Sequence, residues 1–433
     1  MNEDQQKRLL SLLKKGITPA IGCTEPIAVA YAAATAKEQT SNEFQAMQIR
    51  VDSNIYKNGL MVTIPGTKEK GLIPAAVFGY LFGKAKRGFR VIEGLTNKNI
   101  EDGKKLIQQN KVTLILDREH KGLYIEVILT TTMEKVRVVI TKNHLNISSI
   151  EKIERNKDFE PLYLDTSNSY SPNHFIQEYT LDDFLHFIQE IPIENLLFLE
   201  EGVEMNLRIA QEGMTINSGV GATINNLVKK GIFSDNMVSR AQVLCAAAAE
   251  ARMTGSSLPV MSTVGSGNHG ITVFLTNLAV AEKQKSSKED LLKSLMLSHL
   301  LTYFIKSYTG TLSAMCGCGV AAGIGASAGI AYLLGGKKEQ ILGALYNMVG
   351  SISGVVCDGA KGGCAYKLAL ASGWAIQSAL LSLHGAIIHK YDGIVDPDFH
   401  QLFKNLGHLC DPGMISTDQA ILDVMLDKLI HNR

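Results

Sequence analysis

The chain of 433 residues carries 43 basic and 42 acidic side chains, which gives a formal net charge of +1. This balance argues against nucleic acid or an acidic membrane surface as the main partner, and the aromatic content of 6% argues against base-stacking platforms. The length suffices for a large core and predicts two or three domains.

The N-terminal segment predicts a short amphipathic helix over residues 4–14 and not a signal peptide, because acidic residues precede the basic ones and the apolar run is short. Seven cysteines, an odd number without a regular framework, also favour a reduced compartment. We therefore expect a cytoplasmic protein. The sequence does not decide between a monomer and a homo-oligomer.

Cys23 follows a loop over residues 16–22 and precedes a second predicted helix. Thr24 is a good N-cap residue, and Glu25 and Pro26 suit a first helical turn. A thiol beside a helix N-terminus has a lowered pKa and can serve as a nucleophile, a base or a metal ligand. The alternative is a small buried residue without chemistry.

Residues 44–152 predict a small α/β domain whose last strands form an antiparallel meander. The expected strands are 47–51, 112–116, 123–129 and 135–140, and the expected helices are 72–83 and 98–109. Residues 52–59 are interpreted as a polar turn after the first strand. Asn54, Lys57 and Asn58 in this turn are candidates for binding a substrate carboxylate, and a plain hairpin turn is the alternative.

Polar residues 153–178 predict a linker, and residues 179–433 predict an all-α domain because almost no strand pattern remains. The expected helices there are 181–190, 194–211, 217–230, 235–253, 289–306, 320–334, 337–350, 365–389 and 416–430. With residues 1–43 forming N-terminal helices that pack on this domain, the expected fold class is α+β.

Residues 265–270 have the spacing G-x-G-x-x-G, but neither a preceding strand nor a following acidic residue supports a dinucleotide site. A glycine turn that leads into a helix from Ile271 is the better interpretation. The N–H groups at such a helix start bind a carboxylate, and Asn268 and His269 would project into the same space. The alternative is a structural turn with a satisfied histidine.

Residues 307–336 form a run of 30 residues without charge, which by length alone permits a membrane span. Gly, Ala and Ser dominate this run, and Leu and Ile are sparse. A buried helix packed through small residues is therefore expected.

Four of the seven cysteines lie within 49 residues of glycine-rich sequence, at Cys316, Cys318, Cys357 and Cys364. In a reduced compartment such a group indicates a metal or redox site rather than disulfides. Zinc favours paired C-x-x-C units, and dithiol chemistry uses C-x-x-C, whereas the spacings here are C-x-C and C-x6-C. Glycines leave room for a cubane and favour an iron–sulfur cluster. Cys245 is expected in the core, and Cys410 is interpreted as structural.

Three motifs together resemble the bacterial and archaeal L-cysteine desulfidases, within the superfamily of iron–sulfur L-serine dehydratase α chains. They are residues 22–26 (Gly-Cys-Thr-Glu-Pro), residues 266–270 (Ser-Gly-Asn-His-Gly), and Cys316 with residues 357–364 (Cys-Asp-Gly-Ala-Lys-Gly-Gly-Cys). The resemblance spans nearly the whole chain. It implies a [4Fe–4S] lyase without pyridoxal phosphate that converts a small amino acid, L-cysteine, to pyruvate, ammonia and sulfide.

The resemblance places the cluster ligands on Cys357, Cys364 and one of Cys316 or Cys318, of which we select Cys316. Three thiolates leave one iron without a protein ligand, and such an iron can act as a Lewis acid. The thiolate of Cys23 is the expected base. The expected substrate-binding residues are Ser266, Gly267, Asn268, His269, Asn54 and Lys361, although Lys361 also suits a surface turn.

Other functions remain open at this point. The last two ligands of serine dehydratases are spaced more widely than C-x6-C, so the spacing here favours cysteine, but serine dehydration by the same mechanism is the runner-up. An iron–sulfur or zinc module that senses an amino acid is a second alternative. A membrane transporter built on the small-residue helices is a third.

Overall fold

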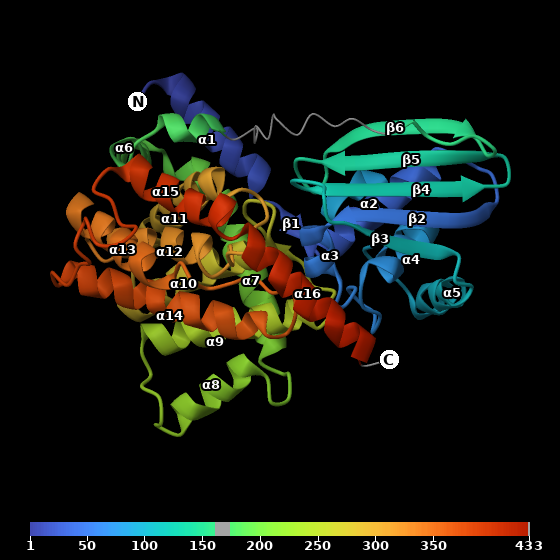
Figure 1. Ribbon diagram of the computed structural model, residues 1–433. Coiled ribbons are helices and arrows are strands. Elements are labelled where there is room, and N and C mark those ends of the chain that lie inside the picture. Colours follow the sequence, from blue (N-terminus) through green and yellow to red (C-terminus); the bar gives the residue numbers. More distant parts are fainter. Residues whose placement is uncertain (161–173, 432–433) are drawn as a thin grey trace.

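The computed structural model describes residues 1–160 and 174–431. A sheet with its covering helices forms one part of the molecule, and a larger body of helices forms the other (Figure 1). The α+β fold class predicted from the sequence is confirmed.

The main sheet contains five strands in the order β3-β2-β4-β5-β6. Their bounds are β2 (Phe44–Asp52), β3 (Val112–Asp117), β4 (Tyr124–Thr131), β5 (Glu134–Thr141) and β6 (Ile147–Glu154). Strands β2 and β3 are parallel, and the other neighbours are antiparallel, so the expected meander is confirmed. Strand β6 was not predicted, because its isoleucines stand three residues apart, with serines and charged residues between them, so no alternation of period two appears.

Three helices cover the apolar face of the sheet: α2 (Thr24–Glu38), α4 (Leu72–Phe82) and α5 (Asn97–Gln108). Helix α2 packs on α4, β4 and β5, whereas α1 (Glu3–Gly16) packs on the helical body. The expectation that residues 1–43 pack on the C-terminal domain stays a prediction for the segment as a whole, although most of α2 packs on the sheet part. Small alanine side chains lie on all sides of α2 itself. The helix is therefore buried on almost every side and fits into the layer between α4 and the sheet.

A short helix, α3 (Ser53–Gly59), replaces the polar turn expected after β2. Asp52 ends the strand and caps this helix, because its carboxylate accepts hydrogen bonds from the backbone N–H groups of Asn54 (2.7 Å) and Ile55 (3.2 Å). Its second oxygen accepts from the backbone of Tyr124 on β4 at 2.8 Å. Asp52 thereby fixes α3 to the sheet.

The helical body contains α6 (Leu181–Glu190), α7 (Phe198–Gly213), α8 (Val220–Lys229), α9 (Met237–Met253), α10 (Gly267–Gln284), α11 (Lys288–Thr309), α12 (Ala321–Leu333), α13 (Lys338–Ile352), α14 (Cys364–Leu383), α15 (Phe399–His408) and α16 (Ile415–His431). The expected helices are confirmed, and α15 is an addition. Short 3-10 turns occur at η1 (Ala85–Arg90), η2 (His174–Glu178) and η3 (Ile193–Asn195). A two-stranded pair, β1 (Pro19–Ala20) with β7 (Val260–Met261), joins the N-terminal segment to this body.

The predicted linker of residues 153–178 overlaps a strand at its start and a 3-10 turn at its end. Its first two residues belong to β6, and its last five form η2. The part from 161 to 173 lies outside the described residues.

Helix α12 forms the central part of the uncharged run of residues 307–336. Its residues are almost all buried between α10, α11, α13 and α14, and its glycines and alanines allow this close packing. Among the described residues, none of the helices combines the length and apolar character that crossing a membrane requires.

Helix α16 leaves the helical body and runs across to α3 (Figure 1). The ammonium of Lys57 on α3 forms an ion pair with Asp418 on α16, and both side chains are largely buried. Arg118, just after β3, pairs with Asp423 further along α16 at 2.7 Å on the surface. The C-terminal helix thus connects the two parts of the molecule.

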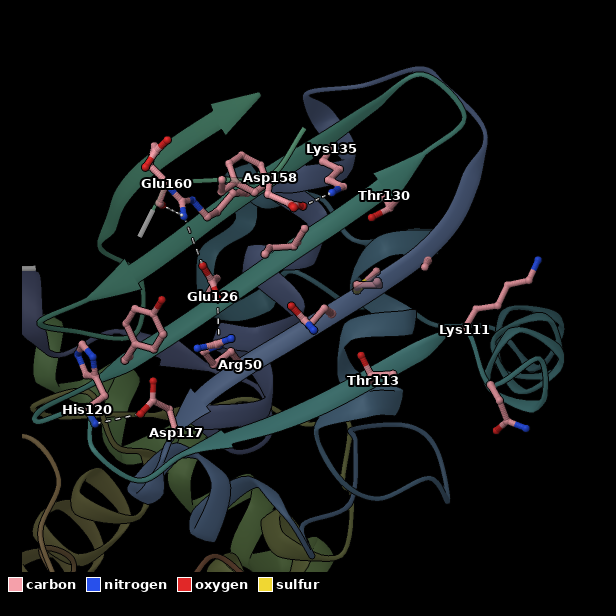
Figure 2. Close-up of a pocket in the computed structure, with 18 residues that line it drawn as sticks. Arg50, Lys111, Thr113, Asp117, His120, Glu126, Thr130, Lys135, Asp158 and Glu160 are labelled. Atoms are coloured by element: carbon pink, nitrogen blue, oxygen red, sulfur yellow. Dashed lines mark hydrogen bonds and ion pairs between the residues drawn. The ribbon is translucent and has the colours of Figure 1, made fainter. Parts of the chain in front are cut away.

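The face of the sheet opposite α2 carries a polar hollow of about 780 Å³ (Figure 2). Across its floor Glu126 lies 3.5 Å from Arg50 and 3.9 Å from Arg137, and Arg137 pairs with Glu151 at 2.5 Å. Phe159 covers the Arg137 guanidinium at 4.5 Å. This alternating row of charges explains how the strands tolerate buried ions on this face.

Candidate active site: a cavity lined by cysteines

A cavity of about 80 Å³ lies where the sheet part meets the helical body. Five cysteines line it: Cys23, Cys316, Cys318, Cys357 and Cys364. All five are free thiols. The fold therefore brings together the four clustered cysteines and the one that stands almost 300 residues before them.

Two of the expected ligands are held by neighbouring stretches of backbone. The N–H of Cys316 donates to the carbonyl of Val355 at 2.8 Å, and the N–H of Cys357 donates to the carbonyl of Ala314 at 2.6 Å. Cys364 begins α14, and its N–H donates to the carbonyl of Lys361 at 2.9 Å. Backbone hydrogen bonds thus set the positions of all three thiols.

The two thiols of the C-x-C pair have unequal proton affinities. The thiol of Cys318 hydrogen-bonds to Cys316 and lowers the pKa of Cys316 to about 6, while the same contact and burial raise the pKa of Cys318. Burial raises the pKa of Cys357 to about 11, and burial also raises that of Cys364.

The donors that line the cavity are thiols, the ligand type that holds iron–sulfur clusters. Within residues 1–160 and 174–431, no three His, Cys, Asp or Glu side chains converge as one ion would require. In a cluster each iron takes its own thiolate, so the thiolates surround the group and need not converge on one point. The absence of a side chain at Gly317 allows the backbone between Cys316 and Cys318 to approach His269, because a Cβ there would lie 2.5 Å from Nε2 of His269.

Cys23 is the N-cap residue of α2, one position before the residue expected to cap it. The expected lowering of its pKa is wrong. Burial, followed by the carboxylate of Glu25, raises the pKa of the Cys23 thiol well above its ordinary value. The thiol donates a hydrogen bond to Oε2 of Glu25 at 3.1 Å. A helix terminus lowers a thiol pKa only where desolvation does not outweigh it.

Glu25 is a buried carboxylate, with 6% of its surface exposed. It also accepts hydrogen bonds from Thr24 Oγ1 at 3.2 Å and from Asn58 Nδ2 at 2.9 Å. Burial acts to raise its pKa, but the nearby His144 and these hydrogen bonds outweigh burial, so the pKa lies below its ordinary value. Glu25 is therefore held as an acceptor beside Cys23.

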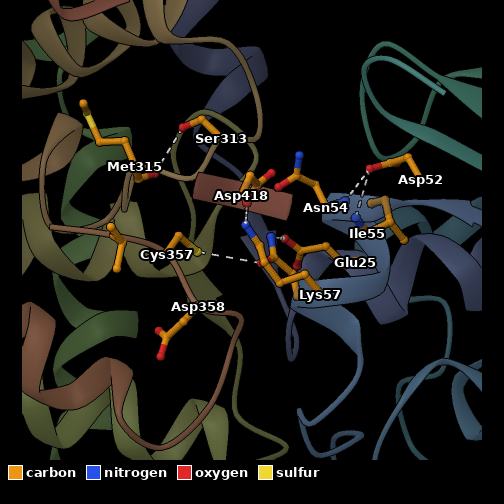
Figure 3. A network of polar contacts seen from close by, with 12 residues as sticks. Glu25, Asp52, Asn54, Ile55, Lys57, Ser313, Met315, Cys357, Asp358 and Asp418 are labelled. Carbon is orange, nitrogen blue, oxygen red and sulfur yellow. Dashed lines mark hydrogen bonds and ion pairs between the residues drawn. The ribbon is translucent and has the colours of Figure 1, made fainter. Parts of the chain in front are cut away.

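The sheet part contributes two further side chains to the cavity. Asn58, at the end of α3, bridges Glu25 and Cys357, since its Oδ1 lies 3.7 Å from Cys357 Sγ. His144, in the turn between β5 and β6, is 3% exposed, and its Nε2 has no hydrogen-bond partner among the described residues. Figure 3 shows Cys357 and Asp418 of the helical body opposite Glu25 and Lys57.

The glycine motif forms the first turn of α10, which begins at Gly267 and not at Ile271 as expected. Ser266, Asn268 and His269 line the cavity. Ser266 Oγ lies 3.8 Å from Cys318 Sγ, and Nδ1 of His269 lies 3.2 Å from the carbonyl oxygen of Thr263. Burial lowers the pKa of His269 to about 3, so its ring is neutral.

Arg252 of α9 supports this turn from behind. Its guanidinium donates to Oδ1 of Asn268 at 2.8 Å and to the carbonyl of Gly22 at 2.6 Å. Gly267 does not line the cavity, because it lies over Arg252: a Cβ at Gly267 would stand 2.5 Å from the Arg252 Nε. Gly267 therefore serves the packing of the turn.

Two expected substrate-binding side chains lie outside the cavity lining. Asn54 stands one helical turn before Asn58, because the segment is a helix and not a turn. Lys361 forms an ion pair with Asp358, and Lys367, which does line the cavity, pairs with the same carboxylate. Of the three candidates in residues 52–59, Asn58 reaches the cavity, and Lys57 pairs with Asp418.

Several side chains of the cavity were not singled out by sequence reasoning: His144, Arg252, Lys306 and Lys367. None belongs to a short motif, and each comes from a different element. Lys306 gave one signal, because it is the last charge before the uncharged run of residues 307–336. Burial lowers the pKa of Lys306, while the thiols around it act in the opposite direction.

Comparisons with known proteins extend over almost the whole chain. The family model of the serine dehydratase alpha chain matches residues 86–423. A UPF0597 protein of Clostridium tetani is 44% identical over 424 residues, which cover 97% of this chain and 98% of that protein. UPF0597 proteins of Alkaliphilus metalliredigens and Caldanaerobacter subterraneus are 42% and 39% identical, and each alignment covers 97% of this chain and 95% or 98% of the relative.

Proposed function

This chain belongs to the serine dehydratase alpha-chain family, and on that premise we propose that it eliminates sulfide from L-cysteine to give pyruvate and ammonia. Membership indicates a dehydratase-like lyase of an iron–sulfur enzyme family. The observation that carries the proposal is the single cavity in which Cys23 and Glu25 face Cys316, Cys357 and Cys364.

The three thiols that the sequence nominated would hold a [4Fe–4S] cluster. When bound, this group supplies an iron without a protein ligand, which acts as a Lewis acid toward the leaving sulfur. Cys318 stays a thiol beside Ser266 in this proposal. Cys316 is preferred as the ligand because its backbone is hydrogen-bonded to the segment that carries Cys357.

Cys23 and Glu25 would share the proton chemistry. Because the Cys23 thiol already donates to Glu25, its proton can pass to Oε2 of Glu25 while Cys23 Sγ takes the proton from Cα of the substrate. The electron pair of the Cα–H bond forms the Cα–Cβ double bond, and the pair of the Cβ–S bond leaves with sulfur. The resulting enamine takes up a proton and then water, which gives pyruvate and ammonia.

The first turn of α10 would orient the substrate. Its backbone N–H groups, with Ser266, Asn268 and neutral His269, suit the α-carboxylate of an amino acid. Arg252 fixes the side chain of Asn268 and so positions the turn. Asn58 takes the place that the sequence prediction gave to Asn54.

L-serine is the second candidate substrate, since the matching family model is that of a serine dehydratase. Two features favour cysteine. The ligand spacing C-x6-C is short, and sulfur is a softer donor and a better leaving group than hydroxide. The same residues would act on either substrate.

The test is an assay of protein purified and reconstituted without oxygen. We expect a brown protein with about four iron atoms per chain that releases sulfide and pyruvate from L-cysteine faster than pyruvate from L-serine. Added pyridoxal phosphate should have no effect. Equal kcat/KM values for the two substrates would assign the chain to serine dehydration. Iron without turnover of any amino acid would indicate a sensor, and zinc without iron would refute the cluster.

A further inference from the structure

One buried lysine at the cavity lacks a carboxylate partner among the described residues. Lys306 on α11 is 6% exposed and lines the cavity. Within the described parts of the chain, its ammonium has no carboxylate partner, and the ionisable groups that surround it are the thiols of Cys316, Cys318, Cys357 and Cys410. A buried ammonium without an opposite charge is strongly destabilising.

The other lysines near the cavity are all paired. Lys57 has Asp418, and both Lys361 and Lys367 share Asp358. Within residues 1–160 and 174–431, the other lysines near the cavity each have a carboxylate, and Lys306, which stands among the cysteines, does not. An anion that arrives after folding would explain this exception.

We propose that Lys306 is the counter-cation of the iron-bound thiolates and retains the cluster by charge. The inference rests on the iron–sulfur centre proposed above. The ligand thiolates would supply the negative charge that the ammonium of Lys306 needs as a partner. Cys316 and Cys357 are both close enough to Lys306 to interact with its charge. The ammonium lies directly beside the segment that carries Cys316 and Cys318, since a Cβ at Gly317 would be in van der Waals contact with Lys306 Nζ at 3.5 Å. Lys306 is thus a positioning residue for the cluster.

The test compares Lys306→Met with Lys306→Arg and with Lys293→Met. Methionine keeps the length and flexibility of the lysine side chain without its charge. Lys293 lies on the same helix but pairs with Glu289 at 2.7 Å, so Lys293→Met is a matched control outside the cavity. Each protein is measured without iron and after anaerobic reconstitution.

Two effects of opposite sign are expected for Lys306→Met. The iron-free protein should unfold at a higher temperature than the wild type, because an unpaired buried charge is gone. The reconstituted protein should lose iron to a chelator about 10- to 100-fold faster, the usual effect of removing a supporting partner of a metal site. Its cluster should also have a lower reduction potential, because a nearby positive charge favours the reduced form. Lys306→Arg and Lys293→Met should resemble the wild type in iron retention.

Normal iron retention and an unchanged potential in Lys306→Met would overturn the inference, and a raised KM alone would assign Lys306 to the substrate carboxylate. A less stable iron-free variant would also overturn it, by making Lys306 structural. Absence of iron from the wild type would instead refute the proposed function, so the two failures can be distinguished.

Discussion

At the scale of single residues, Cys23 and Glu25 form a hydrogen-bonded pair in which the thiol is the donor and the carboxylate is the acceptor. The thiol is buried and protonated, and the carboxylate beside it is held as an acceptor by Thr24 and Asn58. A base in this site therefore depends on both side chains.

We predict that Cys23→Ala and Glu25→Gln each lose turnover by roughly two to four orders of magnitude, the usual contribution of a general base. Both variants should keep normal iron content and fail to exchange the Cα proton of bound substrate with deuterium. Cys245→Ala is the control, since that thiol is buried on α9 outside the cavity lining. Full activity in either Cys23→Ala or Glu25→Gln would contradict the proposal that these two side chains act together as the base.

Asp52 provides a prediction about pH. Burial raises its pKa to about 7, against about 3.9 in an unfolded chain. The folded protein therefore binds this proton more tightly, so the contribution to stability is complete below pH 4 and is lost as the pH rises to about 7. Asp52→Asn keeps an acceptor for the cap of α3 but cannot ionise. The free energy of unfolding of the wild type relative to Asp52→Asn should fall between about pH 4 and pH 7 in urea titrations. Parallel pH profiles would show that the pKa of Asp52 is not raised.

The sequence predicted the types of the site residues better than their environments. Cys23, Ser266, Asn268, His269 and the clustered cysteines do line one cavity, because they belong to motifs whose chemistry needs those residues. Burial is not visible in a motif, so the direction of the pKa shift at Cys23 was wrong. His144 and Arg252 were missed because contact across the fold, not spacing, brings them to the cavity.

At the scale of elements, the expected strands and most helices were found because their periodic patterns are long. Helix α3 was missed, since seven residues give too short a pattern and its polar residues resemble a turn. This error affected the choice of site residues. When residues 52–59 are interpreted as a turn, there is no reason to prefer Asn58 over Asn54. In the structure, the last turn of α3 faces the cavity, so Asn58 lines it.

Helix α16 supports a prediction with a built-in comparison. Asp418→Ala leaves the buried ammonium of Lys57 unpaired and should destabilise the protein by about 3–5 kcal/mol. Asp423→Ala on the same helix removes an ion pair at the surface and should cost about 0–1 kcal/mol. Chemical denaturation of the iron-free proteins measures both. Equal effects would show that the buried pair does not fasten α16.

At the scale of the whole molecule, the candidate site belongs to neither part alone. Cys23, Glu25, Asn58 and His144 come from the N-terminal elements and the sheet part, and the clustered cysteines come from the helical body. The sequence suggested separate domains, but the boundary itself stays a prediction. A shared site means that a group bound there is linked to the stability of both parts.

We therefore predict that reconstitution with iron and sulfide slows amide hydrogen exchange in residues 53–59 and in residues 314–317 together. Residues 97–108 of α5, none of which lines the cavity, serve as the internal control and should not change. Protection confined to residues 314–317 would mean that the sheet part does not respond to the centre.

The pairing of Lys57 with Asp418 also sets an order of events during synthesis. A ribosome delivers the lysine 361 residues before its carboxylate, so a growing chain has no means to neutralise the ammonium within α3. Until α16 emerges, Asp52 holds α3 to the sheet, but nothing in α16 yet pairs with Lys57 or ties α3 to the helical body. The proposed centre would therefore be completed only after α16 has joined α3, and a chain broken before α16 would not retain it.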